Sequence, residues 1–488
     1  MKRFIGVLLV IVLGLSVVAS GCIGGGGSNT NTGTSGEGIT LTIVTRHDAT
    51  IQYKVKQLFL QSDIAKQYNI KDLKFIGVPE SLWPSYIKKG ADVGWGGGGP
   101  TLFDDMYRMG YLAPITDQNI LDLIGKQIPE ELAGMPMVRK NGSQVYWIAA
   151  ALSSFGFTVN KEVLNKQGLP FPPKKWEDVA SPEWARDPQM YGIADPTRST
   201  SNTRIYQIIL QAFGWDEGWR IMTLIAANSK VYEASDAVRD AVINGEIAAG
   251  NTIDFYGYTA MKQNPNCVYV IPEGESIING DPIALLKYSK HPPEAAQAFI
   301  YWVLTEGQKV WMSPDINRLP INPDVFNMTI TEEDAKILFK GQNVGETYAQ
   351  AAPALYKAYQ ISISSKGIPF DDARALKTVN SLQYYFKATL VDVNGPLHQA
   401  WMAIVNAYKE GKITQEQFEK LKDELTAPIE FKDPETGQIV TFTEEYAAKI
   451  NDRIATDAGF QSQLMDEWRT AAQEKYNKVL EELNKITG

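Results

Sequence analysis

The sequence predicts an α/β protein built from two α/β units and a helical C-terminal extension. Short apolar runs typical of strands alternate with helical stretches from residue 39 onward, and a second alternation follows a proline-rich passage at residues 170–173. From roughly Glu346 the pattern becomes helical with few strands. With 488 residues, 44% hydrophobic and 21% charged, the chain has enough apolar material for two or three domains.

Residues 1–22 are typical of a secretory leader. Two basic residues precede an apolar run over residues 4–18, which is shorter than the roughly 20 residues that a membrane-spanning helix needs. Residues 19–22, Ala-Ser-Gly-Cys, resemble a lipobox, so we expect cleavage before Cys22 and a lipid anchor on its thiol at the outer face of the cell membrane. The alternative is an ordinary signal peptide or an uncleaved anchor in which Cys22 is incidental.

Residues 23–38 form a predicted flexible linker. They consist almost entirely of Gly, Ser, Thr and Asn, which cannot bury apolar surface. Such a tether lifts a folded module off a membrane without fixing its orientation. Cys267 is the second of two cysteines, so no intramolecular disulfide framework is expected if Cys22 is acylated.

The first α/β unit begins at residue 39. We expect strands over residues 39–45, 73–78 and 91–93, and helices over 51–68, 83–88 and 100–109. The succession of strand, helix and strand favours a parallel sheet.

The second unit follows an apolar run at residues 145–159, beyond which the proline-rich passage marks a crossover between lobes. We expect strands over residues 191–194 and 247–251 and helices over 201–213 and 236–244. A strand at 283–286 and a helix at 293–305 return the chain to the first lobe. Two helix starts carry a capping pattern, namely Thr331 with Asp334 and Thr414 with Gln417.

Residues 91–115, ADVGWGGGGPTLFDDMYRMGYLAPI, are similar to a stretch of the family 1 extracellular solute-binding proteins, which include ferric-ion and sugar-phosphate receptors. Further segments agree in the family's order: GFTVNKEVL (156–164), NGEIAAGNTIDFYGY (244–258), DPIALLKYSKHPPEAAQAFIYWVLTEGQKVW (281–311) and LPINPDV (319–325). The resemblance covers about residues 39–325.

This resemblance implies the type 2 periplasmic-binding-protein fold, in which two α/β lobes joined by crossover strands close around a ligand. It divides the chain into a leader (1–22), a linker (23–38), a two-lobe domain (39–345, second lobe about 157–262) and a helical extension (346–488). It also implies the extracytoplasmic solute-binding component of an ABC importer, which captures a small solute for a membrane permease. The candidate residues described below favour an anionic or oxygen-rich solute. We expect a monomer that is not an enzyme and has no cofactor.

The glycine loop before the helix at residue 100 is the first candidate for ligand contact. Gly97 and Gly98 offer backbone amides, and Thr101 stands at the helix start, where exposed amides attract anions. The alternative is a tight turn without a ligand. The spacing of Gly94, Gly96 and Gly99 also fits a dinucleotide-binding pattern, but a lone match of this kind is weak.

Arg46, His47 and Asp48 follow the first strand, where open α/β sheets bind ligands. In the ferric members a histidine at the position of His47 is a metal ligand. The alternative is a histidine bonded to a loop carbonyl.

A predicted junction between a strand and a helix, residues 195–204, offers Arg198, Ser199, Thr200, Ser201, Asn202 and Arg204. An arginine with neighbouring hydroxyls can hold phosphate or carboxylate oxygens. The alternative is a helix N-cap at Ser199 or Ser201 beside a solvated arginine.

Asp254 and Tyr256 follow the strand of the second lobe and face the expected cleft. Ferric members carry a tyrosine pair here, but Phe255 replaces the first tyrosine, and Gly97 stands where the ferric pattern has a glutamate. A ferric ion prefers several anionic oxygens, so this loss weakens the alternative of an iron(III) receptor with His47 and Tyr256 as ligands. A small oxyanion or organic solute fits these residues better.

Composition and missing motifs limit the other classes of function. The formal charge of -9 argues against nucleic-acid binding. A secreted metal-dependent hydrolase is the main rival, but H-E-x-x-H, G-x-S-x-G and Cys-x-x-Cys are absent, and the three histidines, His47, His291 and His398, are scattered. Sequons at Asn141 and Asn327 predict surface positions.

Overall fold

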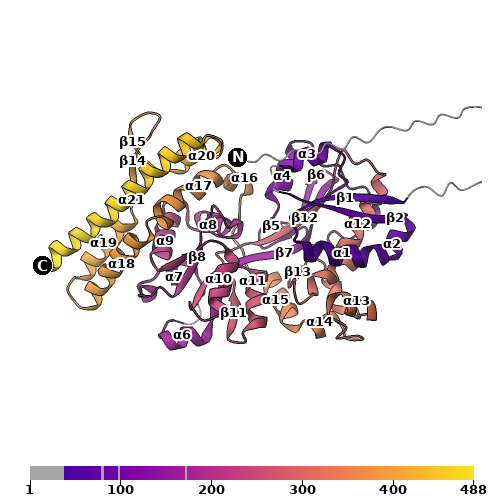
Figure 1. The fold of residues 1–488 in the computed structure, drawn as a ribbon, viewed down its shortest axis with the longest axis horizontal. Helices are drawn as coiled ribbons and strands as arrows, with labels where there is room; N and C mark the ends of the chain where they lie inside the picture. Colours follow the sequence, from indigo (N-terminus) through magenta and orange to yellow (C-terminus); the bar gives the residue numbers. More distant parts are fainter. Residues whose placement is uncertain (1–37, 79–81, 97–98, 171–172) are drawn as a thin grey trace, which may run out of the picture. The chain divides into compact units, whose positions relative to one another are not determined.

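The central feature of the protein is a mixed sheet, which Figure 1 shows in a computed structural model. The structure describes residues 38–78, 82–96, 99–170 and 173–488. The sheet has eleven strands in the order β2-β1-β3-β12-β7-β10-β8-β9, and β6, β11 and β13 also pair with β7. The predictions for Cys22, for the leader and for nearly all of the linker lie outside the described residues.

The first lobe contains the parallel part of the sheet that the sequence predicts. Strands β1 (Ile39–Thr45), β2 (Ile70–Gly77) and β3 (Val93–Trp95) run parallel, with Ile43 of β1 opposite Phe75 and Val93. The core side of this sheet is well covered, since Leu41, Ile43 and Val44 of β1 are fully buried and every residue of β3 is buried. The remaining elements of this stretch are α1 (Ala49–Gln61), α2 (Asp63–Gln67), α3 (Trp83–Lys88), α4 (Thr101–Arg108), α5 (Gln118–Leu121), β4 (Glu131–Leu132), β5 (Met135–Pro136) and β6 (Val138–Asn141).

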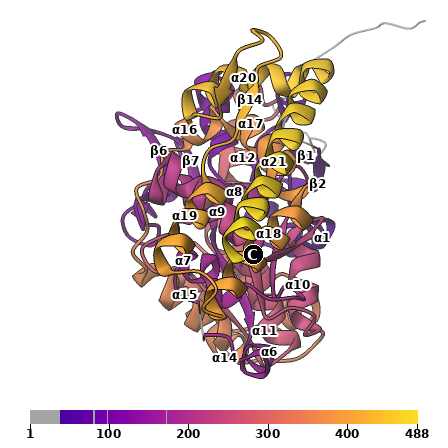
Figure 2. The same ribbon diagram turned by 90° about the vertical axis from the view of Figure 1, so that its left-hand side faces the viewer.

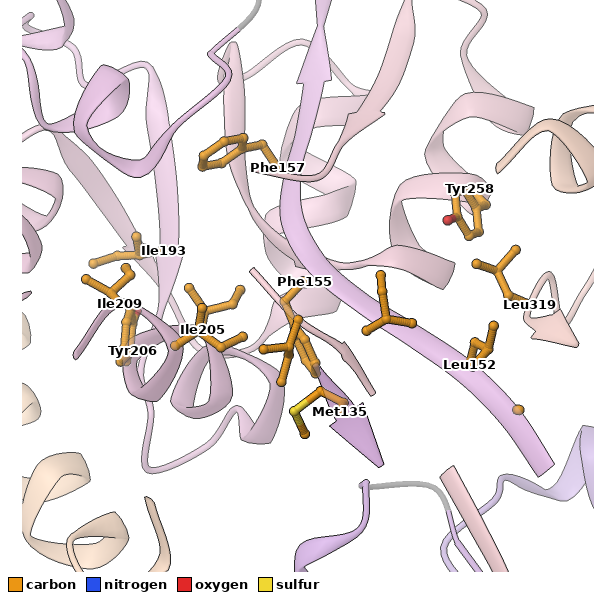
Figure 3. Packing of buried hydrophobic residues seen from close by; sticks show 14 of the residues in the cluster. Met135, Leu152, Phe155, Phe157, Ile193, Ile205, Tyr206, Ile209, Tyr258 and Leu319 are labelled. Atoms are coloured by element: carbon orange, nitrogen blue, oxygen red, sulfur yellow. The ribbon is translucent and has the colours of Figure 1, made fainter. Parts of the chain in front are cut away.

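Two long strands connect the lobes. Strand β7 (Gln144–Asn160) pairs antiparallel with β12 (Ile278–Leu285) along its first half and with β10 (Ala249–Ile253) and β11 (Cys267–Val270) along its second half. The apolar run of β7 is almost entirely buried, which explains why one strand continues through both lobes. Figure 3 shows Leu152, Phe155 and Phe157 along this strand. These connecting strands make the whole sheet mixed, whereas the sequence predicted only its parallel parts.

The second lobe repeats the parallel arrangement. Strand β8 (Tyr191–Ala194) pairs in parallel with β9 (Ser229–Tyr232) and with β10. Ile205, Tyr206 and Ile209 pack from α8 (Thr200–Phe213) near Ile193 of β8 (Figure 3). The other helices are α6 (Lys161–Gln167), α7 (Trp176–Ala180), η2 (Pro182–Trp184), α9 (Trp215–Ala227), α10 (Ser235–Ile243) and α11 (Asp254–Gln263). Helix α9 and strands β9 and β11 were not predicted.

The chain then returns to the first lobe, as predicted. Helix α12 (Pro293–Leu304) contacts β12 and β1, and η3 (Glu306–Met312) contacts α1. Helices α14 (Tyr348–Ala351) and α15 (Pro353–Ser364) contact η4 (Pro323–Asn327) and β13 (Leu319–Pro320), respectively. Helix α13 (Glu332–Leu338) begins with the predicted capping box of Thr331 and Asp334.

The C-terminal region, residues 370–488, covers helices of the second lobe (Figures 1 and 2). Helix α17 contacts α8, and α18 and α19 contact α9. Its elements are α16 (Asp372–Leu376), α17 (Val379–Phe386), the π-helix η5 (Lys387–Val391), α18 (Asn394–Lys409), α19 (Gln415–Thr426), β14 (Glu430–Lys432), β15 (Ile439–Thr441), α20 (Glu444–Thr456) and α21 (Ala458–Thr487). The predicted capping box of Thr414 and Gln417 starts α19. Residues 38–488 form one unit by their contacts, and the domain boundaries proposed within them stay predictions.

Candidate functional site

A cavity of about 310 Å³ lies where the two lobes, the connecting strands and the C-terminal region meet. The loop after β1, the start of α4 and the segment before β13 line it from the first lobe, and α8 and the start of α11 line it from the second. Strands β7 and β12 contribute Ser153, Phe155, Asn279 and Asp281. The volume is at the small end of the range typical of ligand pockets, so the cavity suits a small solute.

The lining residues carry an excess of positive charge. Three arginines, Arg46, Arg204 and Arg318, line the cavity. Among the described lining residues, Asp281 alone contributes a carboxylate. Arg46 and Arg318 belong to the first lobe, whereas Arg204 belongs to α8 of the second. Guanidinium groups are suited to bidentate hydrogen bonds with carboxylate and phosphate oxygens.

Arg318 is held from several sides. Its Nη2 donates to Ser153 Oγ at 2.9 Å and to the carboxylate of Asp281, and its Nη1 lies 3.4 Å from His47 Nδ1. Burial lowers the pKa of Arg318 to about 10, so the group stays charged at neutral pH. Its Nε is buried and has no hydrogen-bond partner among the described residues.

Asp281 connects a crossing strand to the loop before α4. Its Oδ1 accepts a hydrogen bond from the backbone N–H of Gly99 at 2.8 Å. Gly99 has a φ of +84°, and a Cβ there would lie 2.3 Å from Nδ2 of Asn279. The close approach of backbone and side chain therefore requires glycine at this position.

Arg204 lines the cavity from the opposite lobe. Its Nη2 donates to Asn279 Oδ1 at 3.2 Å and to Asp372 Oδ1 at 2.5 Å. Its Nε is also buried without a partner in the described part of the chain. Two of the three guanidinium groups thus keep one donor that no described side chain or backbone group uses.

Apolar groups complete the walls. Phe155 and Phe255 contribute rings, and Leu376 and Val379 of the C-terminal region contribute aliphatic side chains. The combination of charged donors and apolar surface is what binding sites for small organic solutes use.

Five of the side chains predicted from the sequence line this cavity. They are Arg46, Thr101, Thr200, Ser201 and Arg204. Ser201 Oγ shares a hydrogen bond with Ser235 Oγ at 2.7 Å. Gly97 and Gly98 lie outside the described residues.

His47 and Asp48 lie outside the lining residues. The imidazole of His47 is buried against Trp95 and Trp311, with ring centroids 4.3 Å and 5.4 Å away. Burial, and then the charge of Arg318, lower the pKa of His47 well below its ordinary value, so the ring is neutral. Asp48 caps α1 and accepts hydrogen bonds from the backbone of Thr50 and Ile51.

Several of the residues predicted in the second lobe also lie away from the cavity. Arg198 forms an ion pair with Glu233 at the surface. Ser199 caps α8, and the Asn202 amide accepts from Ala194 N at 3.1 Å and donates to Ser235 Oγ at 2.8 Å. These three residues lie outside the cavity lining. Ser199 instead caps a helix, as the alternative interpretation predicted.

Asp254 and Tyr256 also lie outside the lining, which instead includes Phe255 between them. The buried carboxylate of Asp254 accepts from the backbone of Ser154 and Phe255, and burial raises its pKa to about 7 against the opposing charge of Arg318. The guanidinium of Arg239 lies 4.7 Å from the ring centre of Tyr256.

Sequence reasoning missed most of the polar lining. Asn279, Asp281 and Arg318 were not predicted, and they are buried polar groups within or beside apolar segments. Asp281 begins a segment that carries the family resemblance, and this position could have indicated it. No pattern in the sequence indicated that residues of the C-terminal region line the cavity.

Metal binding receives no support from the side-chain arrangement of the described residues. Within them, no group of three or more His, Cys, Asp or Glu side chains is placed to hold a metal ion. The iron alternative and the expectation of no cofactor stay predictions.

The family model described as "Bacterial extracellular solute-binding protein" matches residues 87–339, just over half of the chain. The chain belongs to this family. The predicted recognition, an extracellular solute-binding protein, is confirmed at this level. The family is one of transport-associated binding proteins and not of enzymes. Within its described residues, this solute-binding protein has no helix that is both long and apolar enough to cross a membrane.

Known relatives resemble parts of this solute-binding protein. The "Phosphoglycerate transport regulatory protein PgtC" of Salmonella typhimurium and that of Salmonella typhi are each 31% identical over 179 residues, 36% of this chain. The match spans 43% of the length of these curated relatives. Among solved structures, AfuA of Actinobacillus pleuropneumoniae with bound fructose-6-phosphate is 18% identical, with 66% of this chain and 98% of that chain covered and a TM-score of 0.46. Iron-bound HitA of Pseudomonas aeruginosa is 19% identical, with 66% and 99% covered and a TM-score of 0.46.

Proposed function

We propose that this protein captures a small anionic, oxygen-rich solute in the cavity between its lobes and delivers it to a membrane permease. The observation that carries the proposal is the set of three arginines, Arg46, Arg204 and Arg318, around a cavity of about 310 Å³. Two of them keep a buried Nε–H without a partner among the described residues. Because an unsatisfied buried donor costs free energy, a ligand oxygen at these donors stabilises the protein.

The positions of the lining residues support solute capture by lobe closure. Arg46, Thr101 and Arg318 belong to the first lobe, and Ser201 and Arg204 belong to the second. A solute that contacts both sets gains its full binding energy only when the lobes are together. It therefore shifts the population toward the closed state, which a permease can recognise.

Phosphorylated hydroxy acids are the solutes that we test first. A phosphate and a carboxylate on a short carbon chain offer oxygens to several guanidinium groups at once. The name of the curated relatives supports the choice of phosphoglycerates. The protein contributes binding and no chemical step.

Retention at the outer face of the membrane is part of the same proposal. The leader and the lipobox-like residues 19–22 support a lipid anchor on Cys22. Expression of the Cys22→Ser chain in the native host tests it, since loss of the thiol releases the protein into the medium. A chain that stays with the membrane fraction overturns the anchor.

Isothermal titration calorimetry and thermal unfolding test the solute class. The panel contains 3-phosphoglycerate, inorganic phosphate, fructose 6-phosphate, spermidine and ferric citrate. A ligand at 100 times its dissociation constant adds about 2.7 kcal/mol of stability, so binding is visible as a raised melting temperature. We expect stabilisation by the phosphate compounds; a response to spermidine or ferric citrate alone contradicts the proposal.

Two arginine variants connect the response to the cavity. Arg46→Gln removes an exposed lining guanidinium without opening the core, and we expect roughly tenfold weaker binding of 3-phosphoglycerate. Arg186→Gln is the matched control, because Arg186 lies outside the lining and donates to the backbone oxygen of Glu183. Equal losses in both variants would indicate a general charge effect and not a site.

A further inference from the structure

Helix α16 of the C-terminal region lies against the second lobe beside the cavity. The Gln211 side chain exchanges two hydrogen bonds with the backbone of Asp371, at 2.7 Å and 2.9 Å. Gln207 Nε2 donates to the backbone oxygen of Ala375 at 3.2 Å, and Arg374 forms a two-point ion pair with Glu444. These contacts fix the backbone of α16 with respect to α8.

Asp372, the first residue of α16, reaches across to the first lobe. Its Oδ1 accepts a hydrogen bond from Thr101 Oγ1 of α4 at 2.7 Å and one from Arg204 Nη2 of α8 at 2.5 Å. The side chains of Arg204 and Asp372 are only 10% and 11% exposed. One carboxylate oxygen thus bridges two lining residues from opposite lobes.

Phe370 adds a second contact from the same segment. Its ring centre lies 4.3 Å from Cζ of Arg204, so the guanidinium is covered by an aromatic face next to its carboxylate partner. The C-terminal region therefore supplies both the carboxylate that pairs with Arg204 and the ring that covers one face of its guanidinium.

We propose that Asp372 is an internal carboxylate that occupies an anion position of the binding site and sets its specificity for charge. The inference deepens the proposed function and rests on it. Thr101 and Arg204 are donors that line the cavity, and the arrangement around Asp372 Oδ1 is the one that an oxygen of a carboxylate or phosphate ligand would use. An anionic group of the solute competes with Asp372 for these donors.

The consequence is a penalty that grows with the charge of the solute. A fixed negative charge beside the cavity repels a dianion more than a monoanion, and the effect is strong because the group is largely buried. Since the backbone of α16 is anchored, the solute displaces the carboxylate by rotation of the Asp372 side chain. A neutral side chain of the same shape removes the repulsion and leaves Arg204 available to the solute.

Titration of three chains with three probes tests this inference. The chains are the full-length wild type, Asp372→Asn and the control Asp371→Asn; the probes are 3-phosphoglycerate, inorganic phosphate and glycerate. Asparagine keeps the shape of the aspartate side chain that it replaces. At position 371, where Asp371 accepts a hydrogen bond from Arg374 N, asparagine can still cap α16. We expect Asp372→Asn to bind 3-phosphoglycerate about tenfold more tightly than the wild type, with a smaller gain for glycerate and no gain in Asp371→Asn.

The outcomes separate the inference from the proposed function. If the wild type binds 3-phosphoglycerate or phosphate and Asp372→Asn binds it equally or more weakly, the inference is wrong and the proposed function stands. If none of the chains binds any of the probes, the proposed function is wrong and the inference fails with it. Asp372→Ser is titrated in parallel, and thermal unfolding shows whether each variant is folded, so that a misfolded variant is not counted.

Discussion

The ring of Tyr206 in α8 lies flat against the ring of Phe386 in α17, with centroids 4.0 Å apart and an interplanar angle of 15°. Tyr206 is buried on its other side by the second lobe and donates its hydroxyl to the backbone oxygen of Ala194 at 2.9 Å. Trp219 of α9 meets Tyr385 edge to face at 4.9 Å. The C-terminal region and the second lobe therefore share one aromatic core.

Phe386→Ala tests this shared core. Phe386 is 1% exposed, and truncation of a buried phenylalanine to alanine costs about 3–5 kcal/mol through lost burial and the cavity left behind. We expect a loss of that size in denaturant unfolding, in a single transition reported equally by both regions. Tyr53→Ala is the control, because Tyr53 is 62% exposed and its loss leaves the stability within about 0.5 kcal/mol. A separate early transition of the C-terminal region alone contradicts the prediction.

Truncation after residue 345 removes the C-terminal region together with α14 and α15 and tests their joint contribution to the site. The deletion removes Leu376, Val379 and Gln383 from the cavity lining and uncovers Tyr206 and Trp219. We expect a chain that aggregates or that has lost binding of the anionic solute, measured by calorimetry after size-exclusion chromatography. A stable truncated chain with wild-type affinity contradicts this expectation and places capture entirely before residue 346.

Local patterns in the sequence predicted most of the fold that positions the site. Strand β8 and helix α3 begin and end at the predicted residues, and both predicted capping boxes are present. Such features depend on neighbours within a few residues. The antiparallel pairings of β7 with β10 and β12 instead join residues 90 or more positions apart, which no local pattern encodes.

The site was less predictable than the fold. Arg46, Thr101 and Ser201 end strands or start helices, so their place next to a cleft follows from the topology of α/β sheets. Asp281 and Arg318 are buried charges whose role depends on each other, although they lie 37 positions apart. Asp372 belongs to a short helix that reaches the cavity only through tertiary packing.

Removal of one partner of the Arg318 and Asp281 pair should be strongly destabilising. Their side chains are 8% and 5% exposed, and an uncompensated buried charge costs about 3–5 kcal/mol. We expect this loss in Asp281→Asn, measured by urea unfolding. The double variant Arg318→Met, Asp281→Asn recovers part of the loss, because it removes the charge that was left alone. A double variant less stable than the single one contradicts the prediction.

The neutral imidazole of His47 makes stability depend on pH. Its pKa in the folded protein is well below 6.5, so the unfolded chain binds a proton first as the pH falls. The contribution of His47 is fully present above about pH 6.5 and is lost below it by about 1.4 kcal/mol for each pH unit, until the folded pKa is reached.

Asp254 acts in the opposite direction and must be separated from His47. Its folded pKa of about 7 lies above the ordinary value of a carboxyl group, so the folded protein gains stability as the pH falls through 7 toward about 4. The wild-type profile is the sum of both effects. The difference between the wild type and His47→Asn isolates the imidazole, because the variant keeps Asp254 and an acceptor near Arg318. We expect the variant to lose less stability than the wild type between pH 7 and pH 5 in urea unfolding. Parallel profiles would mean that the imidazole titrates at its ordinary pKa, which is incompatible with a ring buried beside a guanidinium.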